Sequence, residues 1–312
     1  MRTDDLAELR QLASEIGPPL FGSTCSIEPL EGTDSQQPAP ADATAKGVFA
    51  RSGGRRLAVV FLSNQTDPDM AARNARKARQ VRDLLGEDLG CVVLNPLKEG
   101  VFQNRSFVVW PWCSSWSRYR LLRLAQRKLI SLRAMAWLRA VARHTLTDIS
   151  SELRASLYDN PLQFLIEDTR MDSDIRRDAE QMLQRIESAA WHPKGVLEHN
   201  DLWLGNLLLP RKDEKEAGNP YGFIVIDWGG SSYPGHPVFD VLRFCSSAGI
   251  SPRRIRAEIR AHMAITGSAF TDALGCILAG VGTVGLSPGH FPEERYLLGC
   301  RQTYARIKAL IA

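Results

Sequence analysis

The sequence predicts an α+β fold of two lobes, a small β-rich lobe over residues 1–110 and a larger, mostly helical lobe over residues 111–312. Three observations predict it. Short apolar runs separated by turn residues fill the first 110 residues. Residues 115–190 then carry apolar side chains at intervals of three and four, which is typical of helices. Later in the chain, two short apolar runs each lead into polar residues that include an aspartate.

The first lobe is predicted from β-type runs and one helical segment. Residues 33–45 contain no large apolar side chain and indicate a loop, and Ser52-Gly53-Gly54 indicates a hairpin turn. The segment 67–85 is rich in Ala and Arg, which favours a helix ending at Gly86. The predicted order is strand, strand, strand, helix, strand, strand, over residues 24–30, 47–51, 56–62, 67–85, 90–94 and 106–110.

The second lobe begins with a helical region that carries two apolar stripes. One stripe consists of Leu122, Ala125, Leu129 and Leu132, and the other of Ala134, Leu138, Val141 and Ala142. The stripes lie about half a turn apart, so one straight helix cannot turn both toward a single core. We therefore expect a break near Ser131. The same region, 118–143, holds eight basic residues and no acidic one, which indicates either a solvated face or a surface for an anionic partner.

Short strands are predicted at 195–198 and 221–227, and mostly helical structure from Pro237 to the end. The segment Gly280-Val-Gly282-Thr-Val-Gly285 matches the glycine pattern of dinucleotide-binding loops. However, Leu286-Ser-Pro-Gly follows it, where such a loop would need a helix and a later acidic residue. Close helix packing or a turn explains these glycines better.

Composition excludes several classes of protein. The chain is 44% hydrophobic and 24% charged, which is ordinary for a globular protein and rules out overall disorder. The net charge of +4 is too small to indicate nucleic acid as a partner without a clear patch. No run approaches the roughly 18 apolar residues of a spanning helix, and no export signal is evident, so we expect a cytoplasmic protein.

Polar residues that suit phosphoryl transfer gather after the two late strands. Asp201 and Asn206 are five residues apart in a loop between apolar segments, and Asp227 ends the apolar run 221–226. Side chains at the ends of neighbouring strands can converge on one cleft. In phosphoryl transfer, a carboxylate accepts the proton of the attacking hydroxyl, and oxygen ligands hold magnesium on the nucleotide phosphates.

These residues carry a family resemblance. The pattern His199-x-Asp201-x-x-x-x-Asn206, followed by Asp227-Trp228-Gly229, resembles the aminoglycoside phosphotransferase and choline kinase family. The family consists of small-molecule kinases with a protein-kinase-like fold, and includes sugar and lipopolysaccharide-core kinase-like members. The order of the elements agrees over most of the chain, whereas the specific motifs lie within residues 195–243.

The resemblance implies a role for each matching residue. Asp201 would be the catalytic base, and Asn206 and Asp227 would be magnesium ligands. His199 and Asp240 would support the loop structurally. The stretch from Trp110 to Cys113 falls where the family's hinge between the lobes holds adenine through its backbone.

The chain departs from the family at the phosphate-binding lysine. The predicted third strand, 56–62, contains no lysine, and the helix after it contains no glutamate as far as Leu85. Lys46, just before the second strand, could supply the missing cation by reaching into the cleft from the neighbouring strand. Arg73 or Arg76 could instead approach from the helix. Loss of nucleotide binding is the remaining explanation.

The resemblance therefore implies an ATP- and magnesium-dependent phosphotransferase whose acceptor is a hydroxyl of a small molecule or glycoconjugate. The basic stretch 118–143 favours an anionic or sugar-like acceptor over a cationic aminoglycoside, and also indicates peripheral contact with an anionic surface. Two alternatives stay open. One is a non-catalytic pseudokinase that binds a partner, and the other is a nucleotidyltransferase with the same fold.

Overall fold

The computed structural model describes residues 3–22, 25–30, 45–51, 54–210, 219–287 and 292–312. The chain divides into two compact units. The first consists of Met1–Ser117 with Leu207–Gly229, and the second of Arg118–Asn206 with Gly230–Ala312. The first division thus falls between Ser117 and Arg118, and a late segment, Leu207–Gly229, returns to the first unit. The predicted loop 33–45 lies outside the described residues except for Ala45.

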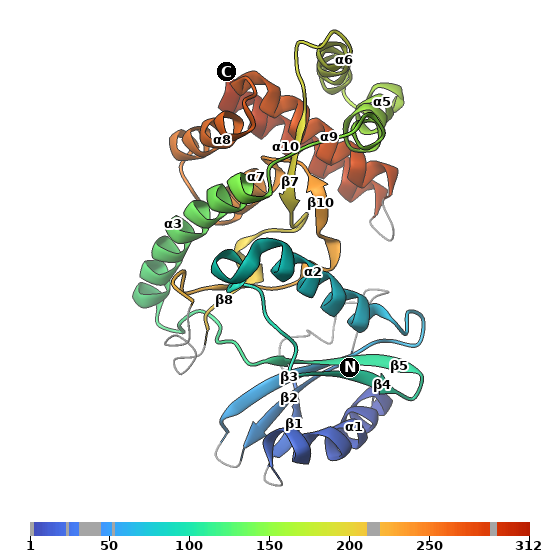
Figure 1. Cartoon of the computed structure of the whole chain (residues 1–312), viewed down its shortest axis with the longest axis vertical. Helices are drawn as coiled ribbons and strands as arrows, with labels where there is room; N and C mark the ends of the chain where they lie inside the picture. Colours follow the sequence, from blue (N-terminus) through green and yellow to red (C-terminus); the bar gives the residue numbers. More distant parts are fainter. Residues whose placement is uncertain (1–2, 23–24, 31–44, 52–53, 211–218, 288–291) are drawn as a thin grey trace. The chain divides into compact units, whose positions relative to one another are not determined.

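The first unit is built on a five-stranded antiparallel sheet in the order β1-β2-β3-β5-β4 (Figure 1). Helix α1 (Thr3–Phe21) packs on one face, where Leu9 and Leu12 join a core with Phe49 and Val60. The sequence analysis missed this helix, although its apolar spacing signals it. The strands are β1 (Cys25–Pro29), β2 (Ala45–Arg51), β3 (Arg56–Leu62), β4 (Lys98–Phe102) and β5 (Arg105–Pro111).

Helix α2 (Met70–Gly90) lies against the other face of this sheet, where Ala71 and Ala75 pack with Val108 and Trp110. The predicted helix is confirmed but runs past its predicted end. Gly86 does not stop it, because the chain kinks there at φ 68° and a last turn follows. That turn contains Glu87, which is exposed.

One predicted strand is wrong. Residues 90–94 form no strand, because Gly90 still belongs to α2 and Val93 makes only an isolated bridge to Val225. The apolar run there reflects burial in a turn, since Val92 and Val93 are fully buried without a neighbouring ladder. The sequence analysis also missed β4, whose residues Lys98-Glu-Gly-Val-Phe are mostly polar or exposed.

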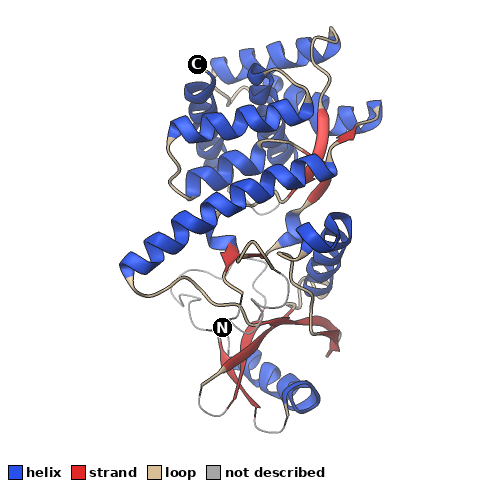
Figure 2. Ribbon diagram, turned by 60° about the vertical axis from the view of Figure 1, so that its left-hand side comes forward, coloured by secondary structure: helices blue, strands red, loops and turns tan. Residues whose placement is uncertain are grey.

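The second unit is mostly helical, as predicted, around a small sheet in the order β10-β7-β6 (Figure 2). Its strands are β6 (Thr147–Asp148), β7 (Lys194–Glu198) and β10 (Ser232–Gly235). Its main helices are α3 (Arg120–Thr145), α4 (Ser151–Arg154), α5 (Asn160–Glu167), α6 (Ser173–Glu187), α7 (Phe239–Ser247), α8 (Pro252–Thr266), α9 (Ala273–Leu286) and α10 (Glu293–Ile311). Strands β8 (Leu207–Leu208) and β9 (Ile224–Val225) pair with each other and belong to the first unit.

The expected break in α3 near Ser131 is wrong, and the helix continues from Arg120 to Thr145. The argument for a break assumed that both apolar stripes are buried. Only the second stripe is, through Ala134, Leu138 and Val141. The first stripe stays at the surface, so the two stripes place no conflicting demand on the helix.

The glycine pattern at 280–285 lies inside α9, which confirms close packing and leaves no phosphate loop there. A Cβ on Gly280 would meet the Phe239 ring at 2.5 Å, and one on Gly282 would meet the carbonyl oxygen of Pro161 at 2.2 Å. Small residues therefore let α9 approach its neighbours closely. Among the described residues, no single helix is long and apolar enough to cross a membrane, although the bent pair formed by α8 and Phe270–Leu286 meets that test together.

Candidate functional site

The loop that carries Asp201 leaves the central strand of the second unit. Strand β7 is buried from Gly195 to Glu198, and the loop begins directly after it. His199 is buried, and its Nδ1 accepts a hydrogen bond of 3.3 Å from the backbone N–H of Asp201. Asn200 adopts a left-handed conformation at φ 68° and donates from Nδ2 to the Gly230 carbonyl at 2.9 Å. The turn that exposes Asp201 is therefore fixed on both sides.

Asp240, at the start of α7, accepts hydrogen bonds from the backbone of the same loop. Its Oδ2 accepts the backbone N–H of His199 at 2.5 Å, and the carboxylate also accepts from the backbone of Leu202. The Ser247 hydroxyl accepts the N–H of Leu204 at 2.9 Å. Since these partners come from one helix, α7 acts as a rigid base for the loop. This geometry supports the structural roles that the resemblance implies for His199 and Asp240.

A buried group of ionisable side chains lies under the loop. Burial, together with the charge of Glu198, raises the pKa of Asp240 to about 7. Glu198 Oε2 accepts from the backbone N–H of His236 at 2.8 Å and lies 3.0 Å from its Nδ1. Burial alone would lower the pKa of His236, but the charge and hydrogen bonds of Glu198 outweigh it and raise the pKa. The charge of Glu198 therefore raises the pKa values of both Asp240 and His236.

Asp201 itself is half-exposed, and two side chains orient its carboxylate. Arg243 forms an ion pair with Oδ1, and Asn206 Nδ2 lies 3.4 Å from Oδ2 and 2.9 Å from the Asp201 carbonyl oxygen. The structure thus brings the two predicted residues together. Sequence reasoning missed Arg243. Its position three residues after Asp240 on a predicted helix places both on one face, and that spacing could have indicated it.

Asp227 lies in the first unit, directly after β9. It is exposed, it adopts φ 67°, and its carboxylate makes no hydrogen bond or ion pair with any described residue. Trp228 is buried beside it and donates from Nε1 to the Val225 carbonyl at 3.0 Å. The turn is therefore anchored by the tryptophan while the carboxylate stays available.

Helix α2 meets this turn through an amide side chain that sequence reasoning missed. A Cβ on Gly229 would lie 2.3 Å from Oδ1 of Asn74, so the helix and the turn are in close contact. Asn74 is neutral and partly buried. A carboxylate at this position would be costly without a cationic partner, and β3 offers no lysine to pair with it.

The donor set suits magnesium. The Asn206 side chain donates hydrogen bonds from Nδ2 to Asp201. Its Oδ1 accepts no hydrogen bond from the described residues. The carboxylate of Asp227 is likewise unengaged. Oxygen donors of these two types are those that Mg²⁺ prefers, with water and phosphate oxygens completing its shell.

Lys46 lies on the same face of the first sheet as α2. In the register, Lys46 stands opposite Phe61 of β3, and Phe61 stands opposite Val108 of β5. Opposite residues share a face, so Lys46 projects on the side where Val108 packs against α2. Its Nζ lies 5.1 Å from the centre of the Phe61 ring. A cation thus occupies the strand position beside the one where the family's lysine is absent.

The predicted hinge is tied into the first unit. Trp110 ends β5 and packs against α2, and Cys113 is buried just beyond. The backbone N–H of Trp112 donates to the Leu57 carbonyl at 3.1 Å, and Ser114 exchanges two backbone hydrogen bonds with Leu209. The segment is therefore rigid on both sides of Cys113.

The two arginines of α2 differ as alternatives to Lys46. Arg73 forms an ion pair with Asp67, which hydrogen-bonds it and raises its pKa. Its charge is already balanced. Arg76 is exposed and makes no ion pair with any residue of the described part.

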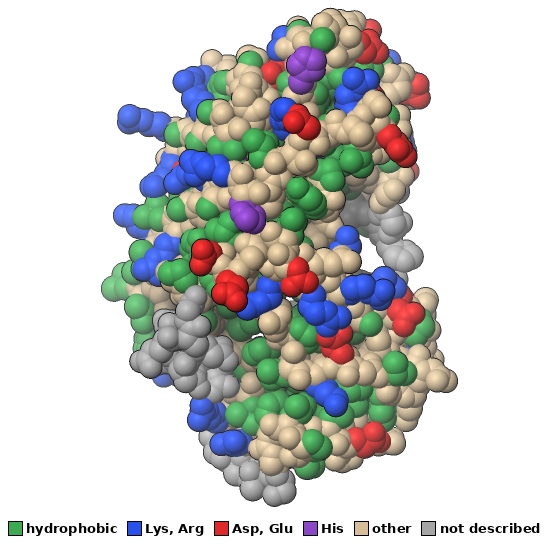
Figure 3. All heavy atoms as spheres, viewed as in Figure 1, with side chains coloured by type: hydrophobic (Ala, Val, Ile, Leu, Met, Phe, Trp, Pro, Cys, Tyr) green, Lys and Arg blue, Asp and Glu red, His purple; other side chains and the backbone are tan. Residues whose placement is uncertain are grey.

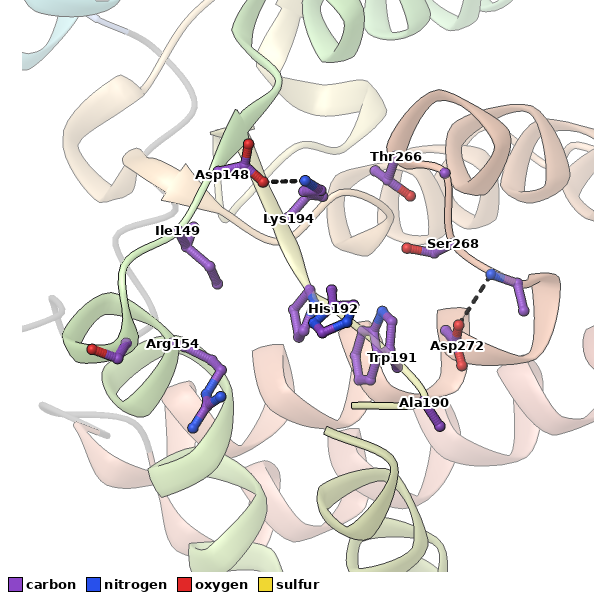
Figure 4. A pocket seen from close by; sticks show the side chains of 14 residues that line it. Asp148, Ile149, Arg154, Ala190, Trp191, His192, Lys194, Thr266, Ser268 and Asp272 are labelled. Carbon is purple, nitrogen blue, oxygen red and sulfur yellow. Dashed lines mark hydrogen bonds and ion pairs between the residues drawn. The ribbon is translucent and has the colours of Figure 1, made fainter. Parts of the chain in front are cut away.

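A polar cavity of about 670 Å³ opens in the second unit, away from the loop (Figure 4). It lies around Lys194 at the start of β7, whereas Asp201 follows the other end of that strand. The strand's rise of about 3.3 Å per residue separates the two by more than ~10 Å. An acceptor bound in this cavity would not reach Asp201. Its lining includes Asp148, Arg154, Trp191, His192, Ser268 and Asp272.

Comparisons with known proteins connect the chain to a group of kinases. No protein-family model matches the sequence, and no curated protein does. Among solved structures, a variant of aminoglycoside 2'-phosphotransferase-IIIa bound to GDP matches with a TM-score of 0.56 at 14% identity, covering 98% of this chain and 97% of that one. A thermostable mutant of aminoglycoside phosphotransferase APH(4)-Ia, in a ternary complex with AMP-PNP and hygromycin B, matches with a TM-score of 0.57 at 15% identity, covering 97% of each chain.

A choline/ethanolamine kinase family protein from Mesorhizobium loti also matches, with a TM-score of 0.52 at 18% identity, covering 98% of this chain and 95% of that one. The alignments extend over nearly the full length of every partner. They show that the chain has the fold of aminoglycoside phosphotransferases and choline kinase-type proteins. The predicted α+β, protein-kinase-like fold is confirmed.

Proposed function

From the fold shared with these kinases, we propose that the chain is a phosphotransferase that moves the γ-phosphoryl group of ATP, with magnesium, to a hydroxyl of a small molecule or glycoconjugate. The observation that carries the proposal is the Asp201 loop. A half-exposed carboxylate is oriented by Arg243 and Asn206, on a turn fixed by buried His199 and Asp240. Such a rigid, accessible carboxylate is what a base for an attacking hydroxyl requires.

In the proposed reaction, Asp201 accepts the proton of the acceptor hydroxyl. The bond from the acceptor oxygen to the γ-phosphorus forms, the bond from that phosphorus to the β–γ bridging oxygen breaks, and ADP leaves with the electron pair. Asn206 and Asp227 would hold magnesium, which neutralises phosphate charge when bound. Arg243 pairs with Oδ1 of Asp201 and Asn206 Nδ2 lies 3.4 Å from Oδ2, so the two side chains would hold the carboxylate in place while it accepts the proton.

Lys46 is proposed as the cation that binds the nucleotide phosphates in place of a lysine on β3. Its position supports this role, since it lies directly across from Phe61 on the face that α2 shares. Arg73 is a weaker candidate because Asp67 already balances its charge. A lysine reaching from the adjacent strand would end within a few ångströms of the usual location, because paired strands lie about 4.8 Å apart.

The acceptor is proposed to be anionic or sugar-like. A small cavity of about 50 Å³ lies beside Arg243. Its lining consists of Phe239, Leu242, Arg243, Ser246, Thr303 and Arg306. Arg306 is exposed and has no ion-pair partner among the described residues. The Arg306 guanidinium, beside that of Arg243, which is paired with Asp201, gives this cavity a positive charge that suits a phosphate or carboxylate group of an acceptor and disfavours the cationic aminoglycosides.

The proposal is tested by measuring magnesium-dependent ATP turnover and nucleotide binding in parallel. Wild-type protein should bind MgATP, seen as a rise in melting temperature, and hydrolyse it slowly without acceptor. Asp201→Ala should keep the binding and lose the turnover. Binding without turnover in the wild type would support the pseudokinase alternative, which the lysine-free β3 motivates. If the wild type shows no binding of MgATP and no turnover, the proposal is overturned.

A further inference from the structure

The first three turns of α3 leave an apolar stripe on the surface of the second unit. Leu121 is 82% exposed, Leu122 and Leu124 are each 51% exposed, and Leu129 is 49% exposed. Tyr119, directly before the helix, is 63% exposed. Single exposed leucines are common on proteins, but four within nine residues of one helix are not.

The helix geometry separates this stripe from the buried one. Residues advance by about 100° around an α-helix, so Leu121, Ala125, Leu129 and Leu132 fall on one face. The buried residues Ala134, Leu138 and Val141 fall on the opposite face. The stripe therefore points away from the core of the second unit and has no partner within it.

Basic side chains occupy the same turns without balancing acids, with Arg120, Arg123 and Arg127 on the side of the helix opposite the leucines and Lys128 beside them. Arg120, Arg123, Arg127 and Lys128 make no ion pair with any residue that the structure describes. Further along the same helix, Arg139 does form one, with Glu258. In Figure 3, hydrophobic and basic side chains share the left edge of the molecule, where Figure 1 places α3. Four basic side chains without an ion-pair partner thus lie in the same turns of α3 that expose the leucines, and Arg143 near its end is likewise exposed and unpaired within the described residues.

We propose that this segment, residues 119–132, docks the protein on an anionic lipid bilayer. The leucine face would enter the boundary between headgroups and acyl chains, and the long arginine side chains of the other face would reach lipid phosphates. A lipid surface fits better than an acidic protein groove, because leucines on one face and basic residues on the other are the arrangement of a helix that lies in a membrane interface. The inference does not depend on the proposed phosphotransferase activity.

The test is co-sedimentation of the full chain with vesicles, either of phosphatidylcholine alone or of phosphatidylcholine and phosphatidylglycerol in equal amounts. We expect binding to the mixed vesicles only, weakened by added salt. The double variant Leu121→Glu/Leu129→Glu should bind at least about tenfold more weakly, since two apolar contacts are lost and two negative charges added. Leu298→Glu, which changes a leucine on α10 that is 54% exposed, is the matched control and should bind like wild type.

Circular dichroism melts check that Leu121→Glu/Leu129→Glu and Leu298→Glu fold. We expect both to fold, because the three leucines they replace are exposed. The triple variant Arg120→Gln/Arg123→Gln/Arg127→Gln should lose the preference for the anionic vesicles. Equal binding to both vesicle types, no binding by wild type, or unchanged binding by Leu121→Glu/Leu129→Glu would overturn the proposal. So would a dimer, seen in sedimentation velocity without lipid, that Leu121→Glu/Leu129→Glu dissociates, because the stripe would then cover a second copy.

Discussion

At the scale of single residues, the Asp201 loop depends on groups that never face solvent. Asp240 accepts two backbone N–H groups of the loop while its Oδ1 has no hydrogen-bond partner among the described residues, and the charge of Glu198 acts on it through the protein interior. A carboxyl group in that position is most stable when it keeps its proton. The loop is therefore coupled to pH through a residue that does not take part in the chemistry.

This coupling predicts that stability falls as pH rises between about 4 and 7. The pKa of Asp240 is raised from 3.8 to about 7, so in this window the folded chain holds a proton that the unfolded chain has lost. Asp240→Asn, which cannot titrate, should show a smaller decrease in the free energy of unfolding over the same window. Urea unfolding at several pH values measures this. An equal decrease in both proteins would contradict the assignment to Asp240.

A second residue-scale prediction concerns Lys46. Lys46→Met should lower kcat/KM for MgATP by about 10- to 100-fold, because a hydrogen bond between charged groups contributes roughly 1.5–3 kcal/mol. Arg76→Met is the control, since Arg76 is exposed on α2, and should change little. The exchange Lys46→Phe/Phe61→Lys places the lysine on β3 and should restore part of the activity. A larger loss from Arg76→Met than from Lys46→Met would assign the cation to α2.

At the scale of elements, the sequence predicted most of the fold because apolar spacing and glycine turns are local signals. Apart from α1, whose local signal was overlooked, it failed where tertiary context decides. Residues 90–94 look like a strand but lie buried in a turn, and β4 is polar because it forms the edge of the sheet. The continuity of α3 could not be predicted either, because periodicity does not reveal whether an apolar stripe is covered. Of the site, the motif residues were found. Arg243 was missed although its spacing from Asp240 could have indicated it, whereas Asn74 emerges only from packing.

Helix α9 offers a test of packing at this scale. Gly282→Ala should lower the free energy of unfolding by about 1–3 kcal/mol, because its Cβ would meet a backbone carbonyl oxygen that cannot move aside. Gly299→Ala on α10 is the matched control, since nothing lies within 4 Å of its Cβ. That change should be neutral or stabilise by up to about 1 kcal/mol. Thermal melts compare the two. Equal effects would mean that α9 tolerates a wider spacing than the structure gives it.

At the scale of the whole molecule, the chain keeps a kinase fold at 14–18% identity to the solved structures it matches. The site residues are divided between the two units, with Asp201 and Asn206 in one and Asp227 in the other.

That division predicts how magnesium acts on stability. ADP with magnesium at about 100 times its Kd should stabilise the wild type by about 2.7 kcal/mol, and ADP with EDTA by clearly less. Asp227→Ala should remove the difference between the two conditions, because one of the two proposed ligands is gone. Differential scanning fluorimetry measures the shifts. A magnesium effect that persists in Asp227→Ala would show that Asp227 does not hold the ion.

The most direct test of the proposed phosphoryl transfer is the identity of the nucleotide product. We would follow MgATP by phosphorus NMR in the presence of wild type and of Asp201→Asn. The account predicts ADP with phosphate, or with a phosphorylated acceptor once one is supplied, from the wild type, and unchanged ATP from Asp201→Asn. AMP with pyrophosphate would contradict it in favour of nucleotidyl transfer. ATP that stays intact with both proteins would contradict it in favour of a binding module.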